Sequence, residues 1–353
     1  MSENYHEEVR TKNILALREL LTELPPFLWD FFTGISQTKG SRTQTAYARD
    51  LRLFFEYLTG SEPAFKGKPM TALDTDDLAR VTAEQIERFI AYIALYEKAG
   101  ESGKRYVHNH REGQSRKLAA IRTMFAYFYK HKRIPANPAE LVDFPQLSQK
   151  AIVRLEPEEV VKLLDEVESG DRLDPRQKKF HDATKTRDLA IVTLLLGTGM
   201  RISECIGVNL EHVDFEANGV KIRRKGGDEA VVYFGDEVEA ALRAYLEQRK
   251  KITPLPGHEA ALFLSGQRRR ITDRAVQKMV KKYAGLVTPL KKISPHKLRS
   301  TFGTNLYRET GDIYLVADVL GHADVNTTRK HYAEIADDQR RRAARVVRLR
   351  EEE

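Results

Sequence analysis

The sequence SPHKLRSTF, residues 294–302, predicts the start of a helix. Ser294 is a suitable N-cap, and Pro295 suits the first helical turn because a backbone N–H there would have no partner within the helix. His296 and Arg299 then lie three positions apart, on one face near the amino end of the helix. Backbone N–H groups and the helix dipole favour phosphate at such an end. The stretch therefore predicts a phosphate-binding helix end that carries an imidazole and a guanidinium.

Three further stretches in the same half of the chain combine glycine with reactive side chains: GTGMRISE (residues 197–204), RRKGGD (223–228) and LGHADVNTTRKHY (320–332). In the first, Arg201 follows a predicted helix end that contains glycine. In the second, Lys225 lies at the tip of a predicted strand hairpin. The third contains His322 and ends at Tyr332. Each motif is short, so the specific signal is their combination in this order.

At these separations, the four stretches resemble the catalytic domain of the tyrosine recombinase and phage integrase family. The likeness is close over residues 155–335, and residues 40–135 resemble the family's helical DNA-binding domain in general pattern. The segment before residue 40 looks longer than the family's minimal form. Carried over position by position, the resemblance implies six catalytic residues and a supporting carboxylate: Arg201, Lys225, His296, Arg299, His322, Tyr332 and the supporting Glu204.

The chemistry of these residue types agrees with that assignment. Attack on a phosphodiester builds negative charge on the non-bridging oxygens, and the guanidiniums of Arg201 and Arg299 can hold those oxygens through paired hydrogen bonds. Tyrosine has a pKa of about 10 in solution and attacks poorly unless a neighbour takes its proton. Tyr332 would therefore be the nucleophile, and His296 the base that receives its proton.

The other two residues would assist the phosphate and the leaving group. His322 could hydrogen-bond the phosphate, and Lys225 could protonate the departing 5′ oxygen. Lys221 is the rival for this acid role, but it belongs to the predicted strand rather than the tip, so Lys225 is preferred. His331 has no catalytic place in the resemblance and is expected on a helix surface.

The charge balance suits a nucleic-acid partner. The 353 residues include 59 basic and 51 acidic ones, which gives a net charge of +8 and a pI of about 9.3. Lysine and arginine displace the counterions bound to phosphates, so a basic protein favours a polyanion such as double-stranded DNA. Candidate phosphate contacts lie on the polar faces of predicted helices and on the hairpin: Arg42, Arg49, Arg116, Lys117, Arg122, Arg223 and Arg224. Solvated surface charge explains each of them equally well.

Several other chemistries find little support. The single cysteine, Cys205, excludes an internal disulfide or a multi-cysteine zinc site, and its mixed apolar surroundings predict a buried structural thiol. The chain has no HExxH motif, no acidic cluster with two-metal spacing and no phosphate-binding P-loop. The nuclease-like string HNH, residues 108–110, stands in a charged predicted loop without partners. We therefore expect no metal and no cofactor.

The expected fold class is mainly α. We predict a helical DNA-binding domain over residues 1–135, a proline-containing linker over 136–154, and a mixed α/β, mostly helical catalytic domain with a C-terminal helix over 155–353. Helices are expected at residues 41–58, 82–99, 115–132, 157–168 and 187–199, and a strand hairpin at 213–234. Residues 170–186 are expected to form a charged loop.

The function implied is site-specific recombination of DNA through a 3′-phosphotyrosyl intermediate. Four protomers would act on two DNA sites, either as copies of one chain or together with a related recombinase. The compact chain favours the Xer group, which resolves chromosome dimers. An integrase of a mobile element, a type IB topoisomerase-like nicking and resealing enzyme, and a non-catalytic DNA-binding relative are the alternatives. The polar, acidic start MSENYHEEVRTKN and the absence of an apolar run of about 18 residues predict a cytoplasmic, nucleoid-associated protein without membrane contact.

Overall fold

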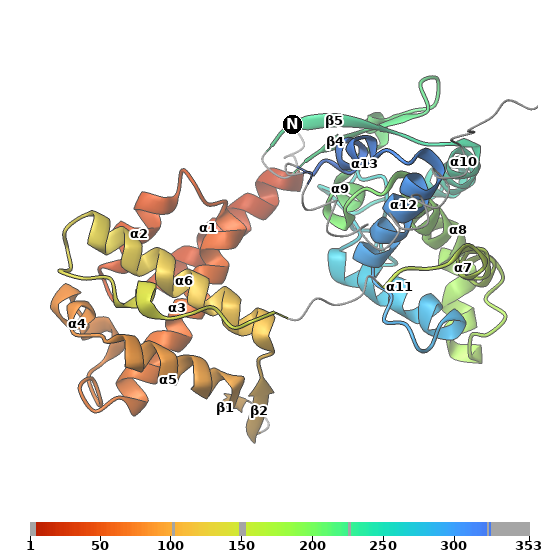
Figure 1. The fold of residues 1–353 in the computed structure, drawn as a ribbon. Helices are drawn as coiled ribbons and strands as arrows, with labels where there is room; N and C mark the ends of the chain where they lie inside the picture. Colours follow the sequence, from red (N-terminus) through yellow and green to blue (C-terminus); the bar gives the residue numbers. More distant parts are fainter. Residues whose placement is uncertain (1–4, 101–102, 148–152, 225–226, 323–324, 326–353) are drawn as a thin grey trace, which may run out of the picture. The chain divides into compact units, whose positions relative to one another are not determined.

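The computed structural model describes residues 5–100, 103–147, 153–224, 227–322 and 325. The chain forms two compact units, Glu3–Lys150 and Ala151–Glu353, which are described separately (Figure 1). Both are built mainly from helices, and the strands in them are antiparallel. The predicted fold class is therefore confirmed.

The first unit is a helical bundle with one aromatic-rich core. Its helices are α1 (Tyr5–Thr22), α2 (Leu28–Ile35), α3 (Ser41–Ser61), α4 (Thr75–Ala79), α5 (Ala83–Ala94) and α6 (Arg111–Lys130), with the short 3-10 helices η1 (Met70–Ala72) and η2 (Pro138–Leu141). Phe54 and Phe89 meet edge to face with ring centres 5.1 Å apart, and both are fully buried. Each such ring contributes roughly 1.5–3 kcal/mol through the area it removes from water. The aromatic stripes of these helices thus form a core, as their spacing predicts.

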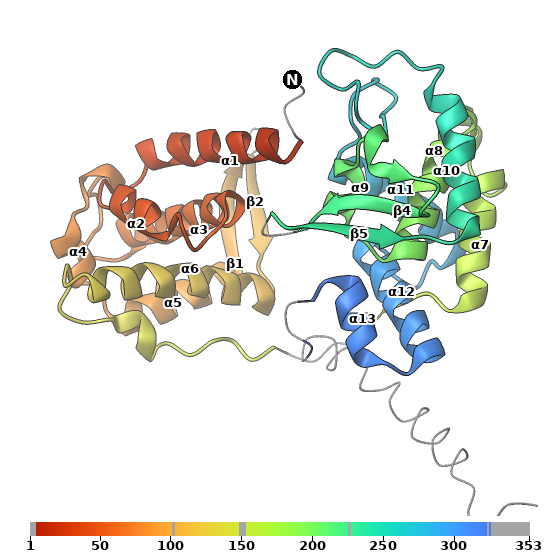
Figure 2. The same cartoon turned by 90° about the horizontal axis from the view of Figure 1, so that it is seen from above.

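A strand hairpin follows α5 where the sequence predicted more helix. Strand β1 (Leu95–Gly100) pairs with β2 (Gly103–His108), and Figure 2 shows the two strands side by side. Thr82 and Gln85 form the predicted capping box at the start of α5, so the error concerns the end of the helix. There Asn109 accounts for the difference, because its side chain donates to the carbonyl of Ile93 at 3.0 Å and its backbone N–H to that of Ala94 at 3.1 Å. These bonds satisfy carbonyls that further helix would have used.

The second unit surrounds a long central helix. Its elements are α7 (Pro157–Ser169), α8 (Pro175–Thr198), α9 (Ile202–Gly207), η3 (Leu210–His212), β3 (Val213–Asp214), β4 (Gly219–Arg223), β5 (Glu229–Tyr233), α10 (Asp236–Arg249), α11 (Asp273–Val287), α12 (Pro295–Thr310) and α13 (Ile313–Leu320). The strands form an antiparallel sheet in the order β3-β4-β5, which confirms the predicted hairpin (Figure 2). Helix α8 packs against α7, α10 and α12, and its residues Ile191, Leu194 and Leu195 are fully buried.

Helix α8 begins earlier than predicted from the sequence. Most of the predicted charged loop, from Pro175 onward, is helical. Asp174 is the N-cap: its side chain accepts a hydrogen bond from the backbone N–H of Gln177 at 2.8 Å, and Pro175 occupies the first turn. Asp174, Pro175 and Gln177 form a capping signal that is visible in the sequence. The many charged residues after it are also typical of a loop, which led to the wrong prediction.

A buried polar network fixes α8 to its neighbours. Asp188 is 2% exposed and accepts hydrogen bonds from Arg187 Nε at 2.9 Å and from Tyr283 Oη, on α11, at 3.1 Å. Burial and the neighbouring Asp188 carboxylate both raise the pKa of Tyr283, which therefore remains a hydroxyl donor. The network thus connects the middle of α8 to α11.

Candidate active site

Arg201 lies between the end of α8 and the start of α9, where it is the N-cap residue. Its Nη1 donates to Glu204 Oε1 at 2.7 Å, and its backbone N–H donates to Glu204 Oε2 at 2.7 Å. The side chain of Glu204 is 3% exposed, whereas that of Arg201 is 31% exposed. A buried carboxylate therefore orients a guanidinium that still reaches solvent.

Arg299 comes from α12 and is 5% exposed. Its Nη1 donates to the carbonyl of Gly199 at 2.7 Å, and its Nη2 donates to the carbonyl of Leu320. These two carbonyls belong to the ends of α8 and α13. The planar guanidinium thus bridges two helix ends, which needs the fixed fork of arginine.

Both arginines converge on the carboxyl end of α13. Arg201 Nη2 donates to the carbonyl of Gly321 at 3.1 Å, directly after the Leu320 carbonyl that Arg299 contacts. Carbonyls at this end of a helix carry partial negative charge and lack partners within the helix, so they attract cations. His322 follows at once, and its backbone N–H donates to the carbonyl of Ala317 at 2.9 Å. Three segments far apart in the sequence therefore bring Arg201, Arg299 and His322 to one turn.

Two glycines make this approach of the segments possible. Gly199 has φ +63°, and a Cβ added there would collide with the Phe302 ring. Gly321 has φ +61°, and a Cβ there would collide with the guanidinium of Arg224. Residues with side chains rarely adopt this left-handed conformation, and here they would also lack space. The backbone conformation and the close contacts therefore explain why glycine occupies these positions in the two motifs.

His296 lies in the first turn of α12, one helical turn before Arg299. Ser294 is the N-cap and Pro295 opens the helix, as predicted. His296 is exposed, whereas Arg299 is buried. The helix therefore presents the imidazole toward solvent and turns the guanidinium inward.

The structure describes some of the hairpin residues but not the proposed nucleophile. Lys225 and Tyr332 lie outside the described residues, as does the predicted C-terminal helix. Lys221, the rival of Lys225, lies on β4, and its Nζ is 2.8 Å from Glu229 Oε2 on β5. Arg223 Nε donates to the carbonyl of Gly227 at 3.2 Å, within the hairpin.

The candidate phosphate contacts of the first unit fall into two groups. Arg42 and Arg49 are exposed on α3. Arg116 forms an ion pair with the buried Asp50. Arg122 donates to the carbonyls of Ala139 at 2.9 Å and Glu140 at 2.7 Å, and its guanidinium lies over the Phe144 ring at 4.8 Å. The guanidiniums of Arg116 and Arg122 therefore take part in contacts that hold the unit together.

Lys117 differs from the prediction, which placed it on a polar helix face. It is 7% exposed, and its Nζ donates to Asn109 Oδ1 at 3.0 Å and lies 3.9 Å from Asp50 Oδ1. Burial lowers the pKa of Lys117, while the Asp50 carboxylate opposes that change. These polar partners allow the side chain to enter the interior, and its contact with Asn109 gives the HNH string a structural role.

Three further observations on the described residues concern the cysteine thiol, metal binding and membrane contact. Cys205 is fully buried, as predicted, and burial raises the pKa of its thiol. Across residues 5–322, gaps excepted, no three His, Cys, Asp or Glu side chains form a metal-binding group. Nor does any helix in the described part combine the length and apolarity needed to cross a membrane.

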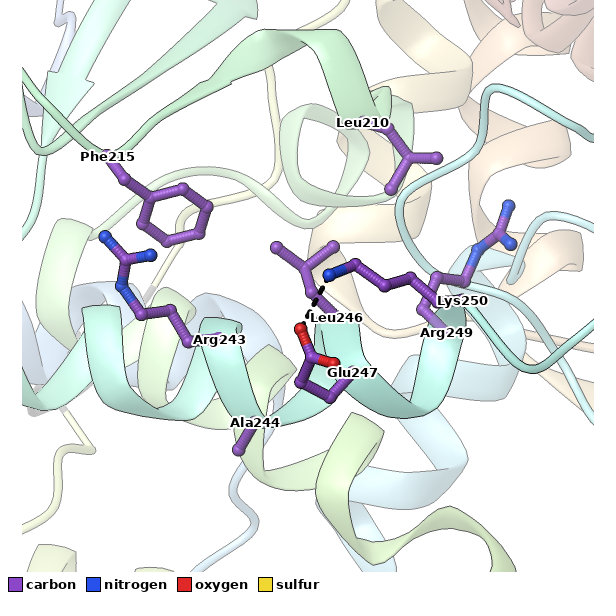
Figure 3. A pocket seen from close by; sticks show the side chains of 8 residues that line it. All are labelled: Leu210, Phe215, Arg243, Ala244, Leu246, Glu247, Arg249 and Lys250. Atoms are coloured by element: carbon purple, nitrogen blue, oxygen red, sulfur yellow. Dashed lines mark hydrogen bonds and ion pairs between the residues drawn. The ribbon is translucent and has the colours of Figure 1, made fainter.

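A cavity of about 540 Å³ lies beside α10 and is shown in Figure 3. Its lining includes Phe215, whose ring lies 4.2 Å from the guanidinium carbon of Arg243, and Glu247, which pairs with Lys250 at 2.7 Å. None of its eight lining residues belongs to the arginine cluster at α13. We therefore place the candidate active site at the end of α13 and not in this cavity.

Comparison with known proteins shows a family likeness that extends over most of the chain. Residues 153–339 match the model of the phage integrase family. The tyrosine recombinase XerC of Thermodesulfovibrio yellowstonii is 30% identical over 331 residues, which cover 90% of this chain and 97% of the relative. XerC of Caldanaerobacter subterraneus subsp. tengcongensis is 32% identical over 339 residues, with coverage of 93% and 88%. The crystal structure of the XerH site-specific recombinase bound to palindromic difH substrate shares the fold, with a TM-score of 0.59 at 21% identity and coverage of 87% and 80%.

The fold and these relatives define an enzyme class, the site-specific tyrosine recombinases. The resemblance drawn from the four motifs is thus confirmed. The chain belongs to the phage integrase family, and within it to the Xer-like recombinases.

Proposed function

We propose that this enzyme cuts and rejoins both strands of a specific DNA site through a covalent bond to Tyr332, and that it resolves chromosome dimers. The observation that supports this proposal most strongly is the convergence of Arg201 and Arg299 beside His322. Two guanidiniums at one point suit a phosphodiester, because both remain charged at any working pH. The relatives named XerC favour a chromosomal role over a mobile-element role.

In the proposed reaction, Tyr332 Oη attacks the phosphorus and passes its proton to His296. The bond between phosphorus and the 5′ oxygen breaks, and Lys225 gives that oxygen a proton. The products are a 3′-phosphotyrosine and a free 5′-hydroxyl. Joining is the reverse step with another 5′-hydroxyl, and the phosphotyrosyl ester retains the energy of the broken bond. Arg201, Arg299 and His322 would stabilise the charge on the non-bridging oxygens.

The proposed assembly has four protomers on two double-stranded DNA sites. The protomers are either all copies of this chain or include a related recombinase. In each protomer, residues 1–135 would bind DNA and the linker 136–154 would lead to the catalytic domain, 155–353. The exposed Arg42 and Arg49 are the candidates that we favour for phosphate contacts in the first domain, because they lie on its surface. Such an enzyme would act in the cytoplasm, at the nucleoid.

Cleavage is expected to proceed in excess EDTA, because Arg201, Arg299 and Lys225 supply the positive charge that Mg²⁺ gives to many nucleases. The test incubates the full-length protein with a nicked suicide substrate and measures the covalent adduct on a denaturing gel, with and without EDTA. A magnesium-dependent nuclease serves as the control for chelation. Loss of the adduct in EDTA and its return with Mg²⁺ would contradict the proposed function.

Lys225→Ala is expected to slow cleavage of ordinary DNA by about 100-fold or more, the usual effect of losing a general acid. The loss should be much smaller when the leaving 5′ oxygen is replaced by sulfur, since a thiolate leaves without a proton. Single-turnover rates on the two substrates measure the difference. Equal losses on both would assign Lys225 to phosphate binding and direct the same test to Lys221.

A further inference from the structure

Arg224 directly precedes Lys225 and closes the β4–β5 hairpin. Its backbone N–H donates to the carbonyl of Asp228 at 2.7 Å, and its own carbonyl accepts from the N–H of Gly227 at 3.1 Å. The side chain, however, leaves the hairpin. Its Nη2 lies 3.4 Å from the carbonyl oxygen of Asp318 and 3.5 Å from that of Val319, both in the last turn of α13.

The contact with α13 is close because Gly321 has no side chain. A Cβ at Gly321 would collide with Nη1, Nε and Cζ of Arg224. The guanidinium therefore lies directly against the backbone of this glycine. From its own position, Arg201 donates to the carbonyl of the same Gly321 at 3.1 Å. One glycine thus joins the hairpin arginine to a proposed catalytic arginine, and His322 is the next residue.

The other described basic side chains of the hairpin behave differently. Lys221 pairs with Glu229 across the two strands, and Arg223 donates back to Gly227. Both interactions stay within the hairpin. Arg224, which is partly buried, instead connects the hairpin to the turn between α13 and His322. The two hydrogen bonds are long, so they contribute little. The contact rests mainly on the attraction between the positive charge of Arg224 and the partial negative charge at the carboxyl end of α13, and on the packing against Gly321.

We propose that Arg224 is a positioning residue for strand cleavage, which ties the end of β4, directly before Lys225 in the sequence, to the turn that carries His322. This inference rests on the proposed acid role of Lys225. A proton donor must reach the 5′ oxygen as the phosphorus–oxygen bond breaks, and a displacement of about 1 Å can cost about 100-fold in rate. An anchor on the neighbouring residue limits that displacement.

Arg224→Ala in the full-length protein tests the inference with the same pair of substrates. Cleavage of the oxygen substrate should slow by about 10- to 100-fold, because the proton donor is no longer aligned. Cleavage of the sulfur substrate should stay near the wild-type rate. The double variant Arg224→Ala, Lys225→Ala should be no slower on oxygen than Lys225→Ala alone, since a missing acid cannot be misplaced.

Arg223→Ala is the matched control, because it removes the same charge from the same hairpin and its hydrogen bond, to Gly227, lies within the hairpin. Any defect that it causes should be equal on the two substrates. Arg224→Lys is a milder second variant, for the case that Arg224→Ala does not fold. It keeps the charge but loses the planar group that packs on Gly321. Its cleavage rate on the oxygen substrate should lie between those of the wild type and Arg224→Ala. Its rate on the sulfur substrate and its DNA affinity should match the wild type.

Equal slowing of Arg224→Ala on oxygen and sulfur would overturn the inference. Weaker DNA binding and a salt dependence reduced by about one phosphate contact would then identify Arg224 as a DNA-backbone ligand. The acid role of Lys225 can fail separately. If sulfur rescues Arg224→Ala but not Lys225→Ala, Arg224 still positions a proton donor, but that donor is another residue.

Discussion

Tyr332→Phe is expected to abolish the covalent protein–DNA adduct and to leave DNA affinity nearly unchanged. The substitution removes one oxygen atom, the one that would attack phosphorus, and leaves every basic side chain in place. Phenylalanine has no nucleophile, so the loss should be complete rather than partial. A nicked suicide substrate on a denaturing gel measures the adduct, and a gel-shift titration at fixed salt measures affinity.

Tyr314→Phe is a suitable control, because Tyr314 lies on α13 and is 71% exposed. That variant should form the adduct at the wild-type rate. If Tyr332→Phe still traps DNA, another of the fourteen tyrosines is the nucleophile. The motif at residues 320–332 would then have been aligned wrongly, and the roles of its other residues would need to be assigned again.

Local sequence signals predicted the parts of the fold that depend on short-range chemistry. The start of α12 has Ser294 at the N-cap and Pro295 in the first turn, and the hairpin of β4 and β5 has its strands on either side of the glycine-containing turn, as predicted. The recombinase class was also predictable, because four motifs occur in one order. Arg201 and Arg299 lie far apart in the sequence, and family resemblance rather than periodicity indicated that they meet.

The features that were not predictable from the sequence depend on contacts between distant segments. Helix α5 ends at Ala94 because Asn109, from beyond the β1–β2 hairpin, occupies its last carbonyls. Lys117 is buried because Asn109 and Asp50 surround its charge. Arg224 is another such case, since neither its spacing nor its charge indicates that it reaches α13. A basic residue on a predicted surface can therefore be a structural contact that only the fold identifies.

Arg299→Lys is expected to reduce the cleavage rate by at least about 100-fold, comparable to the loss of one preorganised donor in other active sites. Lysine keeps the charge but presents it as a point, whereas Arg299 reaches the carbonyls of Gly199 and Leu320 with separate nitrogens. The ammonium can satisfy one of these buried carbonyls, and leaving the other unpaired costs about 1–3 kcal/mol of stability. The substitution should therefore affect both catalysis and folding. Single-turnover cleavage at saturating protein and thermal unfolding measure the two effects.

Arg249→Lys is the control that separates the effect on catalysis from the effect on folding. Arg249 is 4% exposed, and it also donates to backbone carbonyls, at 2.8 Å to Glu259 and at 3.0 Å to Ala261. It lies at the end of α10, outside the arginine cluster. Its replacement should lower stability by a similar amount, because it also leaves a buried carbonyl unpaired, yet the folded protein should cleave DNA at the wild-type rate. If Arg299→Lys matches Arg249→Lys in both measurements, Arg299 only joins α8 to α13, and Arg201 would be left as the single guanidinium on the phosphate.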